Sequence, residues 1–142
     1  MNNQFHAIID GRGLLKVSGP DAGEFLQGLI SNDINLVSAE RTIYAALLTA
    51  QGKFLFDFFI SSLNGDLVLE CEHDRLADLM KKLTMYKLRA DVQLKDISDD
   101  WQVGVLWGDG VAASVGLDNE PGSAMAWSGG VAFVDPRLAG AG

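Results

Sequence analysis

The sequence predicts an α+β domain built mostly from antiparallel sheets with two principal helices. Short apolar runs are joined by glycine-containing turns, a pattern typical of β-hairpins. Two segments with apolar residues at helical spacing interrupt these runs, which favours α+β over a doubly wound parallel fold. The 142 residues, 48% of them hydrophobic, are enough for one domain with a core. We therefore expect one domain over 1–142, undivided or made of two packed subdomains at about 1–100 and 101–142.

The first elements are a predicted hairpin and a short helix. Apolar runs at 5–9 and 14–17 flank the flexible segment 10–13, which predicts two strands joined by a turn. Residues 18–21 (SGPD) form a helix-start signal, with proline suited to the first turn. The helix they start carries a stripe formed by Phe25, Leu26, Leu29 and Ile30.

A second hairpin is predicted from the runs 43–48 and 54–60 around the turn 50–53. The run 54–60 (FLFDFFI) is apolar at both odd and even positions, as in strands covered on both faces. We therefore place it centrally in its sheet. A turn at 64–66 then leads to another strand over 67–71.

A helix from Asp74 to about Lys87 has the clearest periodicity, with Asp74 as its cap. Lys81 and Lys82 lie away from its apolar stripe and are interpreted as solvated charges. Further strands are expected at 91–97 and 101–107, and a last hairpin at 124–127 and 131–134.

Charge and composition limit the partners and the location. The net charge of −8 is a poor match for nucleic acid or an anionic membrane, so neither is expected as a direct partner. No apolar run approaches the roughly 20 residues of a membrane-spanning helix, and the N-terminus lacks signal-peptide features. The single cysteine, Cys71, allows no internal disulfide and indicates a reducing compartment. A cytoplasmic location follows as the expectation.

Common catalytic and metal-binding motifs are missing from the sequence. There is no nucleophile elbow, and Gly52-Lys53 precedes phenylalanine rather than the serine or threonine of a phosphate-binding loop. Cys71, Glu72 and His73 are consecutive, and consecutive strand residues point to opposite faces, so a buried strand cysteine is favoured over a metal ligand. We assign no catalytic residue and no metal site, and expect that the chain is not a complete enzyme.

Asp57 interrupts the apolar run of the predicted central strand. An ionised carboxylate in such a place costs several kcal/mol unless it is paired or hydrogen-bonded. In the structural interpretation, nearby backbone donors or an arginine such as Arg89 satisfy the carboxylate, or it lies at a sheet edge. In the functional interpretation, it lies at the bottom of a pocket for a polar, nitrogen-rich ligand. The spacing supports both interpretations equally.

Four segments resemble the YgfZ-type folate-binding proteins, relatives of the glycine cleavage T-protein (aminomethyltransferase). They are residues 17–33 (VSGPDAGEFLQGLISND), 44–57 (YAALLTAQGKFLFD), 86–92 (YKLRADV) and 135–138 (DPRL). The segments follow the family order over nearly the whole chain, and the first two are the more specific.

The resemblance implies a tetrahydrofolate-binding accessory protein in the assembly or repair of iron–sulfur enzymes, including those that modify tRNA. Of two adjacent aspartates in the T-protein, Asp57 retains the second and Phe56 replaces the first, which puts aminomethyl transfer in doubt. Asp57 is the implied contact for the pterin, with Asn32, Asp33 and Tyr86 lining the pocket. Turn formation by Asn32 and Asp33, and core packing by Tyr86, are the structural alternatives.

The resemblance covers the N-terminal portion of the family only. Family members carry a later Lys-Gly-Cys-Tyr-x-Gly-Gln-Glu motif that this sequence lacks, and Cys71 stands in a different context. The sequence is compatible with both a fragment and a naturally short protein. An aminomethyltransferase-like enzyme using tetrahydrofolate, and an interaction domain that has lost the ligand, are the alternative functions.

Overall fold

The computed structural model describes residues 3–137 and confirms an α+β fold with antiparallel strand pairing. Leu138, the end of the fourth family-like segment, lies outside this range. The elements, in chain order, are β1 (Gln4–Ile9), β2 (Arg12–Ser18), α1 (Ala22–Gln27), η1 (Ile34–Leu36), β3 (Ile43–Leu48), β4 (Phe54–Leu63), β5 (Asp66–Glu72), α2 (His73–Lys87), β6 (Gln93–Asp96), η2 (Ser98–Asp100), β7 (Val103–Gly108), α3 (Val111–Ser114), β8 (Ala124–Trp127) and β9 (Gly130–Phe133).

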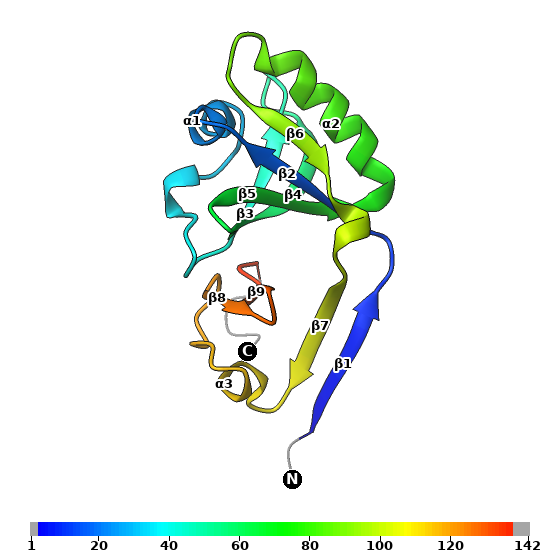
Figure 1. Ribbon diagram of the computed structural model, residues 1–142, viewed down its shortest axis with the longest axis vertical. Helices are drawn as coiled ribbons and strands as arrows, with labels where there is room; N and C mark the ends of the chain where they lie inside the picture. The colour runs from blue at the N-terminus through cyan, green and yellow to red at the C-terminus, as the bar shows by residue number, and fades with distance from the viewer. Residues whose placement is uncertain (1–2, 138–142) are drawn as a thin grey trace.

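A five-stranded sheet in the order β3-β4-β5-β2-β6 lies beside α1 and α2 in the upper half of Figure 1. The predicted β3–β4 hairpin is confirmed, and β4 then pairs with β5 across a tight turn. Asn64 and Gly65 both have positive φ in that turn, as the hairpin geometry requires. β4 has a paired neighbour on each edge, which confirms an interior position, although β5 is the middle strand.

The predicted first hairpin is wrong in its pairing, although both of its strands exist. β2 is hydrogen-bonded to β5 along one edge and to β6 along the other. A strand has two edges, so β2 has none left for β1. β1 instead pairs with β7 in a separate two-stranded ribbon that extends away from the main sheet (Figure 1).

Helix α2 confirms the most periodic prediction, but its cap differs. The helix begins at His73, and Glu72 occupies the cap position without a side-chain hydrogen bond. The chain runs from β5 directly into the helix, and the His73 amide donates to the carbonyl of Gly11 at 2.8 Å. Asp74 thus lies inside the first turn rather than at the cap, where its carboxylate favours the positive end of the helix dipole.

The core lies between the sheet and the two helices. β4 contributes Phe56, Phe58 and Ile60 to it, and buried residues of the helices include Leu26, Leu76, Leu79 and Leu83. Successive strand residues point to opposite faces, so Asp57 and Phe59 lie on the face that α2 does not cover. We call this the Asp57 face.

The C-terminal part contains the predicted β8–β9 hairpin and, in addition, the short helix α3, which the sequence pattern did not indicate. β6 and β7 match the predicted strands at 91–97 and 101–107 with shifted ends. The division near residue 100 stays a prediction, and the β1–β7 pairing crosses it. No helix within residues 3–137 is both long and apolar enough to cross a membrane.

Candidate functional site

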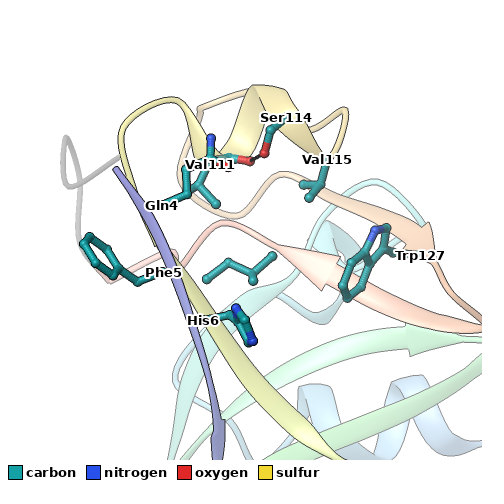
Figure 2. Close-up of a pocket in the computed structure, with 8 residues that line it drawn as sticks. Gln4, Phe5, His6, Val111, Ser114, Val115 and Trp127 are labelled. Carbon is teal, nitrogen blue, oxygen red and sulfur yellow. Dashed lines mark hydrogen bonds between the residues drawn. The ribbon is translucent and has the colours of Figure 1, made fainter. Parts of the chain in front are cut away.

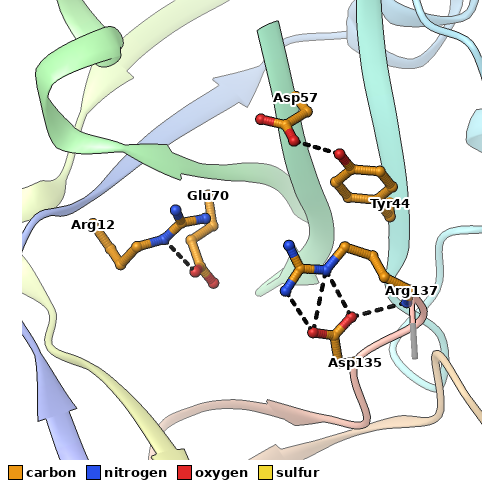
Figure 3. Close-up of polar contacts among 6 residues, drawn as sticks. All are labelled: Arg12, Tyr44, Asp57, Glu70, Asp135 and Arg137. Carbon is orange, nitrogen blue, oxygen red and sulfur yellow. Dashed lines mark hydrogen bonds and ion pairs between the residues drawn. The ribbon is translucent and has the colours of Figure 1, made fainter.

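The Asp57 carboxylate lies on a strand surface lined by aromatic side chains. β3 and β4 place Tyr44 opposite Phe59 and Ala46 opposite Asp57, so all four side chains share this face. The Tyr44 hydroxyl donates a hydrogen bond to Asp57 Oδ2 (Figure 3). Tyr44 is therefore the structural partner that the sequence left open, in place of Arg89. The register of the predicted β3–β4 hairpin was the signal that could have identified Tyr44 as this partner.

The hydrogen bond to Asp57 is the main cause of a raised Tyr44 pKa, with burial and the negative charge of Asp57 adding to it. The tyrosine therefore stays a neutral donor at physiological pH. The half-buried Asp57 carboxylate accepts one hydrogen bond from Tyr44, which leaves further lone pairs on its oxygens unused. Asp57 can therefore accept further hydrogen bonds from a polar ligand.

Phe59 connects this pair to the C-terminal hairpin. Its ring centroid lies 5.7 Å from that of Tyr44 and 5.2 Å from that of Phe133. The contact with Phe133 arises because β9 lies against β4. The Arg137 guanidinium carbon lies 4.7 Å from the Phe59 centroid and 5.6 Å from the Tyr44 centroid. These contacts form a shelf of three aromatic rings beside Asp57, with Arg137 over two of them.

Asp135 holds Arg137 in this position through an ion pair with a 2.7 Å contact (Figure 3). Burial alone would raise the pKa of Asp135, but the hydrogen bonds and charge of Arg137 together lower it. Residues 135–137, from the fourth family-like segment, thus lie beside residues 44–57 of the second. Sequence reasoning did not predict that these two segments meet.

Asn32 and Asp33 form the loop after α1, and their side chains bond to nearby backbone. Asn32 Nδ2 donates to the Tyr44 carbonyl at 3.0 Å, and Asn32 Oδ1 accepts from the Asp33 amide. Asp33 Oδ1 accepts from the Asn35 amide and caps η1. The hydrogen bond from Asn32 to the Tyr44 carbonyl attaches this loop to β3, the strand that carries Tyr44. A ligand-binding role for either residue stays a prediction.

Tyr86 lies apart from the other three predicted site residues. It belongs to α2, which packs on the opposite face of the sheet from Asp57, and its side chain is 37% exposed. The structure therefore brings Asp57 together with Tyr44 and Phe59 but not with Tyr86. Any role of Tyr86 in ligand binding stays a prediction.

Two pockets lie elsewhere, and neither includes Asp57. An open pocket of about 330 Å³ lies between the β1–β7 ribbon, α3 and β8, with His6, Ser114 and Trp127 on its wall (Figure 2). A second of about 210 Å³ lies at the junction of the ribbon and the main sheet. We centre the candidate site on the Asp57 face because it holds a charged group with unused acceptor capacity beside aromatic rings.

Cys71 is a buried strand cysteine, as predicted, with 2% of its surface exposed. Burial raises the pKa of its thiol to about 11. Glu72 and His73 are exposed beside it. Within the part of the chain that the structure describes, no three or more His, Cys, Asp and Glu residues are grouped so that they could hold a metal ion.

Arg137→Ala should raise the pKa of Tyr44 further, because the nearby guanidinium lowers that pKa. The chain has two tyrosines, so tyrosinate absorbance in a Tyr86→Phe background reports Tyr44. Asp57→Asn should shift the pKa in the opposite direction, toward the ordinary tyrosine value. A Tyr44 pKa that does not change in Arg137→Ala would contradict the contact.

The sign of the stability effect follows from the same raised pKa. The Tyr44–Asp57 bond contributes stability fully below the ordinary tyrosine pKa of about 10. That contribution is lost as the pH rises through the raised value in the folded chain. Removal of Asp57 should therefore flatten the alkaline end of the stability profile.

Comparison with known proteins identifies relatives that are much longer than this chain. The mitochondrial iron-sulfur cluster assembly factor IBA57 of Homo sapiens is 36% identical over 100 residues, covering 61% of this chain and 28% of that protein. The mitochondrial IBA57 homolog of Cryptococcus neoformans var. neoformans (serotype D, strain JEC21) is 30% identical over 131 residues, covering 84% and 34%. The chain thus spans about a third or less of the length of these relatives.

The names of these relatives contradict the cytoplasmic location expected from the sequence, because both are mitochondrial proteins. That expectation depended on the lone cysteine, which indicates a reducing environment but does not identify the compartment.

A solved structure and a family model agree on the fold. The glycine cleavage system aminomethyltransferase T of Bartonella henselae superposes with a TM-score of 0.70 at 20% identity, covering 86% of this chain and 35% of that one. The model of the GCVT N-terminal domain matches residues 8–114. These findings confirm the resemblance to the YgfZ and T-protein relatives, and the chain belongs to the GCVT N-terminal domain family.

Proposed function

We propose that this chain is the tetrahydrofolate-binding N-terminal part of an accessory factor for iron–sulfur cluster assembly or repair. The relatives at 36% and 30% identity are named as iron-sulfur cluster assembly factors, which supports the cellular role. The clients we infer are iron–sulfur enzymes and assembly proteins, including enzymes that modify tRNA.

The observation that carries the folate assignment is the Tyr44–Asp57 pair beside the aromatic shelf. A reduced pterin presents several N–H donors along one edge of a planar ring system. A carboxylate with unused lone pairs suits those donors, and the partly exposed rings of Tyr44 and Phe133 suit the planar surface, with the buried Phe59 packed behind them. The residues present therefore fit the group. Asp57 would accept the pterin N–H groups, and Tyr44 would hold Asp57 in place.

Phe56 bears on the alternative of aminomethyl transfer. Its side chain is 6% exposed and packs in the core, and Arg75 stacks on it at 4.4 Å. The side chain at position 56 points away from the Asp57 face. An aspartate at position 56 would therefore not lie beside Asp57, and the doubt about aminomethyl transfer stays a prediction.

Calorimetric titration of the 142-residue chain with tetrahydrofolate, under anaerobic reducing conditions, tests the folate assignment. We expect saturable binding, with a folate-free buffer injection as the blank. A chain that is folded by circular dichroism yet takes up no tetrahydrofolate would contradict the proposal and favour an interaction domain without the ligand.

The cellular role is tested with a chimera. This chain replaces the matching N-terminal segment of the human relative, and the chimera is expressed in cells that lack their own factor. We expect iron–sulfur enzyme activity to recover. A stable chimera that restores no activity, beside a positive control with the human protein, would contradict the role.

A further inference from the structure

The outer side of α2 near its C-terminal end presents exposed apolar side chains among cations. Met85 and Leu88 are 60% and 86% exposed. Lys81 is four residues before Met85, so the two are neighbours on the helix surface, and Lys82 lies beside them. The buried stripe of Leu76, Leu79 and Leu83 is on the other side of the helix. We call Lys81, Lys82, Met85, Leu88 and Arg89 the α2 patch.

Leu88 is the most unusual residue of this patch. It follows the last helical residue and has φ 43° and ψ −105°, a conformation that glycine adopts far more readily than leucine. A leucine with this positive φ is strained, and an 86% exposed side chain recovers little of that cost by burial. Glycine would close the helix more favourably, so the packing of residues 3–137 does not account for a leucine here.

The charges of the patch are available to a partner. Four of the 11 lysines and arginines lie within residues 81–89, in a chain with a net charge of −8. Lys87 donates to the Val92 carbonyl at 2.9 Å and is engaged in the fold. Lys81, Lys82 and Arg89 have no ion-pair partner among the residues that the structure describes.

We propose that the α2 patch docks a protein segment that carries carboxylates around apolar side chains. Met85 and Leu88 would be buried under the apolar residues of the partner, and the three unpaired cations would meet its carboxylates. Leu88 and Arg89, from the segment 86–92, then belong to a docking surface rather than to the Asp57 site. This proposal gives Lys81 and Lys82 a role beyond that of solvated charges.

A protein fits these observations better than a membrane or a nucleic acid. The strongly negative net charge would repel both kinds of anionic polymer or surface over most of the molecule. Two exposed apolar side chains also provide little area for insertion into lipid. The patch lies across the sheet from Asp57, so this inference is independent of folate binding.

The test uses a fluorescent synthetic peptide with glutamates and leucines at helical spacing, titrated into the 142-residue chain at two salt concentrations. A peptide with every glutamate replaced by glutamine is the charge control. We expect saturable binding of the acidic peptide, weakening with salt, and on the order of tenfold weaker binding of the glutamine peptide.

Two variants divide the patch into its apolar and charged parts. Met85→Ser with Leu88→Gly should weaken binding on the order of tenfold without loss of stability, because glycine relieves the strain at position 88. Lys81→Glu with Lys82→Glu should weaken binding and reduce its salt dependence. Lys53→Glu, in the exposed β3–β4 turn, is the matched charge control and should bind as the parent does.

Three results of the peptide titrations would overturn the proposal. They are absence of peptide binding by the folded chain, equal binding by the Met85→Ser/Leu88→Gly variant, and equal loss in Lys53→Glu. Binding to phosphatidylserine vesicles in place of the peptide would assign the surface to lipid and also overturn it.

Discussion

Asp57→Asn is expected to weaken tetrahydrofolate binding by about 10- to 100-fold while changing the free energy of unfolding by less than about 1 kcal/mol. The asparagine carbonyl can still accept the Tyr44 hydrogen bond, so the local packing survives. What is lost is the negative charge, and hydrogen bonds to charged groups contribute more than neutral ones. The effect should therefore appear in affinity rather than in stability.

Calorimetry and urea unfolding of the same preparations separate the two quantities. Asp66→Asn is the matched control, because it makes the same charge change on the same face at the far end of β4 and β5. It should bind tetrahydrofolate as the parent does. If Asp57→Asn instead loses several kcal/mol of stability and keeps its affinity, Asp57 is a structural carboxylate and the site assignment fails.

Gly19→Ala is expected to destabilise the chain by about 2–4 kcal/mol. Gly19 has φ +106°, which is unfavourable for any residue with a Cβ. An added Cβ would also lie 2.4 Å from the Asp91 carbonyl oxygen, a backbone atom that cannot move independently. The Asp21 amide donates to that same carbonyl at 3.2 Å, and the Asp91 amide donates to Asp21 Oδ2 at 2.8 Å. The substitution therefore disturbs the junction between β2, α1 and the segment before β6.

Gly23→Ala is the control for glycine substitution as such. Gly23 lies in α1, and an added Cβ would have no atom within 4 Å. Alanine there should stabilise by roughly 0.5–1 kcal/mol, because it restricts the unfolded chain. Urea unfolding followed by tryptophan fluorescence gives both values. Similar stabilities of the two variants would contradict the close approach at Gly19.

The local pattern of apolar and turn residues was sufficient to predict an element when that element pairs with its neighbour in the sequence. The β3–β4 and β8–β9 hairpins follow from apolar runs around short turns, and α2 follows from a 3.6-residue stripe. Asp57 was identifiable as a candidate because a carboxylate within an apolar strand requires a partner. These features depend on residues a few positions apart, which the sequence displays directly.

Pairing over long distances could not be predicted in this way. β1 is two residues from β2 but pairs with β7, about a hundred residues later, because β5 and β6 take both edges of β2. The Tyr44–Asp57 bond depends on hairpin register, and the contact of Arg137 with Phe59 depends on where β9 lies against β4. Tyr86 and Asp57 lie apart because α2 packs on the face of the sheet opposite to Asp57.

The α+β class, the strands, the main helix, the family and the importance of Asp57 could all be predicted from the amino-acid sequence. Hydrophobic periodicity and turn chemistry act over short stretches, so they can be read without coordinates. Only the tertiary structure decided which strand edges meet, which side chains share the Asp57 face, and that Leu88 is strained and exposed. Those properties depend on edge availability and on packing between distant segments, which no local pattern encodes.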